Sequence, residues 1–308
     1  MINRTIIRIK VLQIVYAYYQ KNSKDLALAE NELMFGLQKS YDLYHYLLFL
    51  IILLTDAEQK RLDIGKNKFL ATDAERNPNR RLADNRLAEV LNRNIQLQKF
   101  AHNKGTFLNT EDFHFVRSTL NKILQSDFYR EYLESDDTYG SDRDFWSTIM
   151  QEQIFNDDDL GELLESQSIY WNDDLEIIGV FVLKTIRRLT DKTSAGKGLY
   201  PMFKDPEDKD FAVRLLHCSL LEGEENSRRI KNQISNWDIE RLALMDLYII
   251  QIALAELRNF PAIPIRVTLN EYIDLARYYS TPKSPVFING ILDAIVKELK
   301  SENILFKN

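Results

Sequence analysis

Residues 260–293 read FPAIPIRVTLNEYIDLARYYSTPKSPVFINGILD, and this stretch favours two helices with short proline-marked connections. Its first two prolines mark an extended connector, because the residue before a proline avoids helical dihedrals. Thr268 and Glu271 have the spacing of a capping box, which predicts the start of a helix. Ser284 followed by Pro285 is typical of an N-cap and first helical position, which predicts that a second helix begins there.

Helical spacing of apolar residues continues through the rest of the chain, and no strand alternation interrupts it. Only ten glycines and seven prolines occur in 308 residues, which leaves long segments without turn-forming residues. These patterns predict an all-α fold. The expected helices cover Asn3–Gln20, Leu26 to about Leu54, Phe113–Leu133, Phe145–Phe155, Leu175–Leu189, Phe211–Ile234 and Leu242–Leu257.

Composition indicates a folded cytoplasmic protein. The hydrophobic fraction is 45% and the charged fraction 28%, both ordinary for a globular domain. A single cysteine, Cys218, excludes an intramolecular disulfide and fits a reducing compartment. The longest apolar run, Tyr46–Leu54, is too short to cross a bilayer as a helix. Gln13 and several tyrosines interrupt the apolar start of the chain, so we do not expect a signal peptide.

Charge is unevenly distributed along the chain, although its formal sum is only −6. Residues 1–24 carry five cations and no acidic residue, whereas Arg143 is the lone basic residue in the acidic stretch 131–176. A basic end on an acidic body can hold a phosphate backbone locally, because charges are screened over about 8–10 Å. The other interpretation is that both stretches are simply solvated helix faces, and charge alone favours it.

No catalytic, cofactor or metal site is predicted. The four histidines are scattered without the spacing of metal ligands. The segment Gly196-Lys197-Gly198 lacks the earlier glycine and the following Ser or Thr of a phosphate-binding loop. The acidic run Asp157–Asp159 lacks the spacing of a calcium loop. These absences favour a binding protein over an enzyme.

Three motifs occur in a characteristic order. The first is the opening basic helix with Gln13 and Tyr16, the second is Trp237–Leu242 with Asp246 downstream, and the third is Phe287–Asp293. Together they resemble the NusB family of transcription antitermination factors. The resemblance covers roughly residues 1–54 and 205–300. It implies a NusB-like helical bundle formed by the two chain ends, with domain segments 1–54 and 205–308 and a large helical insertion at 55–204.

The resemblance also implies a function without catalysis or cofactor. Family members pair with a small-subunit ribosomal protein of the NusE type and bind single-stranded boxA RNA of nascent ribosomal transcripts. They act there within the RNA polymerase antitermination complex, away from any membrane. The RNA-binding positions carried over are Arg4, Arg8, Lys10, Tyr16, Tyr279, Lys283 and Phe287.

These positions differ in role. Arg4 and Arg8 are the phosphate contacts expected on the first helix, and Lys10 lies on a different side of that helix. Lys283 stands where the family often has an acidic residue, and it could add a phosphate contact. The three aromatic positions are expected at or near the RNA surface, although Tyr16 and Phe287 sit among apolar neighbours and could equally belong to the core.

Two rival functions remain open from the sequence. One is a helical protein–protein adaptor that has lost direct RNA binding and uses its acidic middle as the working surface. The other is an RNA-modifying enzyme that carries a NusB-like module, as some RNA cytosine methyltransferases do. No glycine-rich cofactor loop or strand–helix alternation accompanies the module, which disfavours the enzyme.

Overall fold

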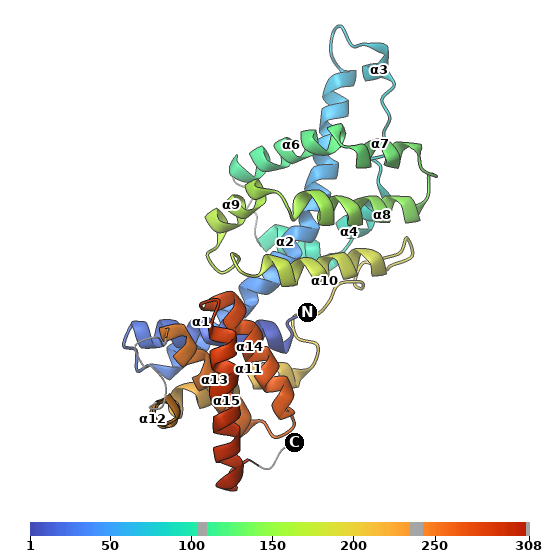
Figure 1. Cartoon of the computed structure of the whole chain (residues 1–308). Coiled ribbons are helices and arrows are strands. Elements are labelled where there is room, and N and C mark those ends of the chain that lie inside the picture. The colour runs from blue at the N-terminus through green and yellow to red at the C-terminus, as the bar shows by residue number, and fades with distance from the viewer. Residues whose placement is uncertain (104–109, 235–242, 306–308) are drawn as a thin grey trace. The chain divides into compact units, whose positions relative to one another are not determined.

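The computed structural model describes residues 1–103, 110–234 and 243–305 (Figure 1). Within these ranges the chain is helical, and the one β feature is an isolated bridge between Ile2 and Phe203. The all-α prediction is therefore confirmed. The helices are α1 (Arg4–Gln20), α2 (Leu26–Lys66), α3 (Asp73–Arg76), α4 (Arg86–Asn92), α5 (Ile95–Asn103), α6 (Thr110–Gln125), α7 (Asp127–Glu134), α8 (Tyr139–Thr148), the π-helix η1 (Ile149–Ile154), α9 (Asp158–Gln167), α10 (Leu175–Arg188), α11 (Pro206–Leu221), α12 (Gly223–Ile234), α13 (Leu244–Asn259), α14 (Ile265–Tyr279) and α15 (Ser284–Ser301).

The helices divide into two compact units. The terminal unit comprises Ile2–Leu37 and Phe203–Asn308, and the central unit comprises Gln38–Met202 together with Met1. The long helix α2 contributes its first turns to the terminal unit and the remainder to the central unit. The contacts thus change units at Leu37–Gln38 and Met202–Phe203, whereas the sequence suggests divisions after residues 54 and 204.

The terminal unit is built around α13. This helix packs against α11, α12, α14 and α15, and α1 packs against both α11 and α13. Eleven residues of α13 are buried, so the helix is enclosed on nearly every side. Three of them are polar, namely Asp246, Gln251 and Glu256, and each must therefore find partners inside the unit. The first helix of the chain is thereby held against helices encoded two hundred residues later.

The structure confirms the predicted first helix and corrects two other predicted helix starts. The side chain of Asn3 caps α1 by accepting from the amide of Ile6, so the predicted first helix is confirmed. The capping-box prediction is wrong, because α14 begins at Ile265 and Thr268 lies one turn inside it, buried. Ser284 is the first residue of α15 rather than its N-cap, and its hydroxyl donates to the buried carboxylate of Asp246 at 3.0 Å.

The predicted single helix from Phe211 to Ile234 is two helices, α11 and α12, which meet at Glu222 and Gly223. Gly223 is buried, and a Cβ there would lie 2.0 Å from the Tyr19 hydroxyl oxygen and 2.8 Å from Nε2 of Gln251. The Gln251 side chain also donates to Tyr19 at 2.8 Å. Only a glycine leaves room for this contact, so close packing on α1 and α13 requires glycine at the start of α12.

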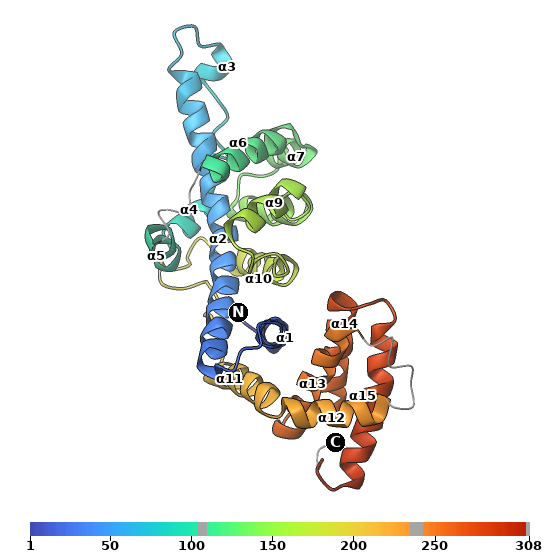
Figure 2. The same ribbon diagram turned by 90° about the vertical axis from the view of Figure 1, so that its left-hand side faces the viewer.

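The central unit is organised along the second part of α2. Figure 2 shows α6, α9 and α10 following one another along one side of α2, with α4 and α5 on its other side. Its fully buried side chains include Trp146, Trp171, Tyr44 and Tyr46. The indole N–H of Trp171 donates to the Lys39 carbonyl at 2.8 Å, which fixes the α9–α10 connection on α2.

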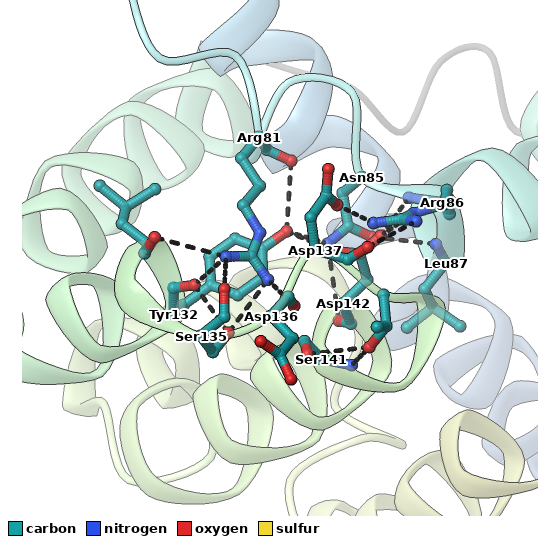
Figure 3. A network of polar contacts seen from close by, with 12 residues as sticks. Arg81, Asn85, Arg86, Leu87, Tyr132, Ser135, Asp136, Asp137, Ser141 and Asp142 are labelled. Carbon is teal, nitrogen blue, oxygen red and sulfur yellow. Dashed lines mark hydrogen bonds and ion pairs between the residues drawn. The ribbon is translucent and has the colours of Figure 1, made fainter.

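A polar network fixes the connection between α7 and α8 (Figure 3). The guanidinium of Arg81 lies 4.2 Å from the ring centre of Tyr132 and donates to the carbonyls of Ser135 and Asp136 at 2.6 Å each. Beside it, Arg86 donates to the buried carboxylate of Asp142 at 2.6 Å. Arg81 thereby saturates carbonyl groups that the end of α7 leaves without helical partners, including that of Leu133 at 3.4 Å. No helix in the described ranges is long and apolar enough to cross a membrane.

Gly223→Ala is expected to lower the free energy of unfolding by roughly 1–3 kcal/mol, because the added methyl group overpacks the contact with Tyr19. Urea unfolding followed by circular dichroism measures the change. Gly161→Ala is the matched control, since a Cβ at that position in α9 meets nothing within 4 Å and alanine favours the helix. Equal effects of the two substitutions would contradict the packing argument.

Candidate nucleic-acid interface

Arg8 lies in the core of the terminal unit, with 2% of its surface exposed. Its Nε donates to Oε2 of Glu256 at 2.8 Å, and its Nη2 donates to Oε1 of the same carboxylate at 2.9 Å. Its Nη1 lies 3.1 Å from the Glu271 carboxylate. This paired geometry joins α1 to α13 and α14, and it is the strongest form of side-chain ion pair.

Glu256 accepts two further hydrogen bonds from α14. Thr268 donates to its Oε1 at 2.9 Å, and Tyr272 donates to its Oε2 at 3.0 Å. Burial alone would lower the pKa of the Arg8 guanidinium, but the hydrogen bond to Glu256 and the charges around it raise that pKa above its ordinary value. Burial, reinforced by the Glu256 charge, raises the pKa of Tyr272 well above its ordinary value. The arginine is therefore charged, and Tyr272 keeps its proton.

The assignment of Arg8 as a phosphate contact is therefore corrected, because a fully paired and buried guanidinium does not reach a ligand. Lys10 is buried as well, with 1% of its surface exposed, so it too is removed from the candidate RNA surface. The basic run at the start of the chain meets carboxylates from distant segments. Besides Arg8 with Glu256, Arg4 lies 3.5 Å from Asp208 and Lys21 lies 3.3 Å from Glu32.

Arg4 remains partly exposed. Its guanidinium lies 5.0 Å from the ring centre of Phe211, and its ion pair with Asp208 lies at the surface. The neighbouring Thr5 hydroxyl donates to Glu271 at 3.1 Å. Arg4 can therefore contact a phosphate, but it would do so in competition with a carboxylate of α11.

Tyr16 is exposed at 39% of its surface, near the other end of α1. One edge of its ring meets Tyr248 of α13 at 6.0 Å between ring centres, in a T-shaped arrangement. Tyr248 in turn stacks on Tyr19 at 5.2 Å with nearly parallel planes. Tyr16 is thus a surface ring supported by a small aromatic cluster, which resolves the alternative of a core position.

The connection between α14 and α15 carries the remaining candidates. Lys283 is exposed, whereas Tyr279 and Phe287 are half-buried. The buried carboxylate of Asp246 holds this connection by accepting from the hydroxyls of Ser280 and Ser284, at 2.5 and 3.0 Å. The most exposed ring nearby is Tyr278, which the sequence pattern did not single out for RNA.

Contacts with α13 show which candidate residues lie at the same end of the terminal unit. Arg8 meets Glu256 while Tyr16 meets Tyr248, so α1 and α13 are antiparallel. The α14–α15 connection contacts Asp246, which places it at the same end of α13 as Tyr16. Arg4 lies toward the opposite end, about 18 Å from Tyr16 along the helix. The candidates are therefore spread along the length of the unit rather than gathered in a compact patch, and we refer to them together as the strip.

No metal centre competes for these residues. Within 1–103, 110–234 and 243–305, no group of three His, Cys, Asp or Glu side chains has a geometry that could hold a metal ion. Cys218 is half-buried, and burial raises the pKa of its thiol. Among the described residues, then, the features available at this strip are rings, cations and helix ends.

Known proteins match the chain over its second half most clearly. The model of the NusB family matches residues 180–297. A transcription antitermination protein NusB of Salinibacter ruber is 37% identical over 107 residues, which cover 35% of this chain and 67% of that protein. The transcription antitermination protein NusB of Geotalea daltonii is 35% identical over 140 residues, which cover 45% of this chain and 93% of that protein. This chain belongs to the NusB family.

The NusB match places the family likeness mainly in the terminal unit, from the middle of α10 to α15. The motif at Phe287–Asp293 falls in the first half of α15, whereas the motif Trp237–Leu242 lies outside the described residues. No solved structure matches the chain. The 140 aligned residues cover nearly all of the Geotalea daltonii protein but less than half of this 308-residue chain.

Arg8→Met is expected to lower the free energy of unfolding by roughly 3–5 kcal/mol, because it leaves the Glu256 carboxylate buried without its cation. Arg4→Met is the matched control on the same helix, and removal of its surface ion pair is expected to cost less than about 1 kcal/mol. Chemical denaturation with both variants measures the difference. Equal destabilisation of the two variants would indicate that Arg8 is solvated. Arg8 would then again be a candidate for contact with RNA.

Proposed function

We propose that this protein is a transcription antitermination factor that binds boxA-type RNA of nascent ribosomal transcripts together with a NusE-type ribosomal protein, in the cytoplasm. The observation that carries the proposal is the 35% identity across 93% of the Geotalea daltonii antitermination protein. The boxA RNA, the NusE-type partner and the polymerase complex come from the family resemblance. The factor acts by binding and needs no cofactor.

The proposed RNA surface is the strip formed by Arg4, Tyr16, Tyr279, Lys283 and Phe287. Single-stranded RNA is held by cations along its phosphates and by rings on which bases stack. In this strip the rings outnumber the cations available to RNA, because Arg4 is paired with Asp208. Affinity for RNA without the protein partner should therefore be low.

A second candidate is a helical adaptor that binds proteins and not RNA. The burial of Arg8 and Lys10 favours it, since two of the expected phosphate contacts are removed from the surface. The two candidate functions differ in one measurable property. Only the antitermination factor is expected to bind RNA at the strip when the protein partner is present. Titration of labelled RNA into the protein–partner mixture distinguishes them.

Binding of labelled boxA RNA to the protein with its own NusE-type partner should weaken with salt. The slope of log affinity against log salt should become shallower by about 0.7 for each phosphate that a variant no longer neutralises on single-stranded RNA. Arg4→Ala with Lys283→Ala should therefore flatten the slope by about 1.4. The control Lys192→Ala with Lys197→Ala removes two exposed lysines of the central unit and should leave the slope unchanged. Absence of RNA binding with intact partner binding would support the adaptor.

Tyr16→Leu should weaken RNA binding by about 1–3 kcal/mol, because leucine retains the packing on Tyr248 but removes the face for base stacking. Fluorescence anisotropy with the same RNA and partner measures the change in affinity. Phe128→Leu is the matched control, since Phe128 in the central unit is exposed at 37%, close to the 39% of Tyr16. Unchanged affinity in Tyr16→Leu would remove this ring from the interface.

A further inference from the structure

The central unit contains a groove between the last turns of α2 and helix α6. Figure 1 shows these two helices next to one another. Its volume is about 790 Å³, within the range of pockets that bind ligands in other proteins. One side of α2 lines it at helical spacing from Ala57 to Gly65, Lys68 follows just after that helix, and α6 contributes Arg117, Leu120 and Asn121. Helix α3 closes one margin. We call this feature the α2–α6 groove.

The floor of the groove is apolar. Leu62 and Leu120 are buried beneath it, and Tyr129 of α7 borders it. Ile64 also lines the groove and is exposed at 67% of its surface. Directly after α2, Phe69 is exposed at 96%. Apolar side chains gathered in this way in a concave surface are typical of a protein-binding site.

The rim of the groove is basic. Four cations line it against one carboxylate, Glu75. Two of these cations are already paired, Arg61 with Glu58 and Lys68 with Glu75, both at 2.6 Å. The other two, Lys60 and Arg117, have no carboxylate within ion-pair distance among the residues that the structure describes, although the charge of Lys60 also acts on the carboxylate of Asp56. The groove therefore presents net positive charge above an apolar floor.

Helix α3 gives the groove a fixed margin. Thr72 and Glu75 form a capping box, and Lys68, two residues after the end of α2, donates to the same glutamate. These hydrogen bonds, first that from Lys68 and then those from Thr72, lower the pKa of Glu75 to about 2. Its charge is thereby directed to α2 and α3 rather than to the groove. The margin is built by local contacts and does not need a ligand to form.

We propose that the α2–α6 groove binds an acidic amphipathic helix of a partner protein, with its apolar side chains on Ile64 and Leu62 and its carboxylates toward Lys60 and Arg117. An amphipathic helix laid in a groove is a recurring recognition mode, and opposite charges at the rim set its specificity. The apolar floor with a single ring disfavours RNA, which is held by successive stacked rings and a continuous cationic track. This proposal goes beyond RNA binding by the terminal unit.

The test is fluorescence anisotropy of the full chain with a labelled peptide of about 18 residues, long enough to form a helix, that carries leucines on one face and glutamates elsewhere. Saturable binding that weakens with salt is expected. Lys60→Glu with Arg117→Glu should raise the Kd at least tenfold, and Ile64→Ser about fivefold or more. The matched controls, Lys192→Glu with Lys197→Glu and the exposed Ile169→Ser (76% exposed), should bind as the unchanged chain does.

Several outcomes would overturn the proposal. They are no saturable binding, equal binding of the peptide with lysine in place of glutamate, and equal weakening in groove and control variants. Labelled oligouridine that binds with the same sensitivity to Lys60 and Arg117 would make the groove an RNA surface. Self-association that disappears in Ile64→Ser, measured by sedimentation equilibrium, would make its occupant a second copy. None of these measurements uses boxA RNA or a NusE-type protein, so they succeed or fail independently of the antitermination proposal.

Discussion

The buried pair of Arg8 and Glu256 is the constraint on which the terminal unit depends. A charge cannot be buried alone without a cost of several kcal/mol, so α1 can dock only where this carboxylate meets it. Thr268 and Tyr272 add hydrogen bonds from α14, so one carboxylate sets the relative positions of three helices. The whole central unit lies between α1 and the other two helices in the chain. The pair therefore specifies how the two ends of the chain assemble, whatever lies between them.

Local sequence patterns predicted the helices well but missed their interruptions. Apolar spacing and the scarcity of glycine and proline account for the all-α fold, and Asn3 marked its first helix correctly. The break between α11 and α12 lies beside the close approach of Tyr19 to Gly223, a contact that no pattern within residues 211–234 contains. Thr268 and Glu271 have the spacing of a capping box, yet both side chains bond to partners across the core. Tertiary contacts decide such details, and single-sequence periodicity does not report them.

In the candidate site, too, nearby sequence predicted some features, whereas contacts with distant segments could not be predicted. The absence of acidic residues from the first 24 positions indicated a cationic surface. However, carboxylates that are distant in the sequence can be close in space. In the fold, carboxylates from α11, α13 and α2 reach Arg4, Arg8 and Lys21. Exposure at Lys283 was easier to anticipate, since it lies between two predicted helices, whereas the sequence left Tyr16 open between core and surface. The α2–α6 groove had no comparable signal, because its residues are spread over some seventy positions with mixed charges.

Carboxylates of the chain itself pair with the arginines of α1, and this pairing affects how the chain would recognise RNA. The salt-dependent part of RNA affinity grows with the number of phosphates that a surface neutralises. With Arg8 inside the core and Arg4 paired, the strip offers few cations, so base stacking and a second protein would have to supply most of the binding energy. A tethered partner raises the effective concentration of the next binding group without adding a contact of its own. A protein-binding groove on the central unit would work in the same way, since an additional anchored partner compensates for an RNA surface that is weak by itself.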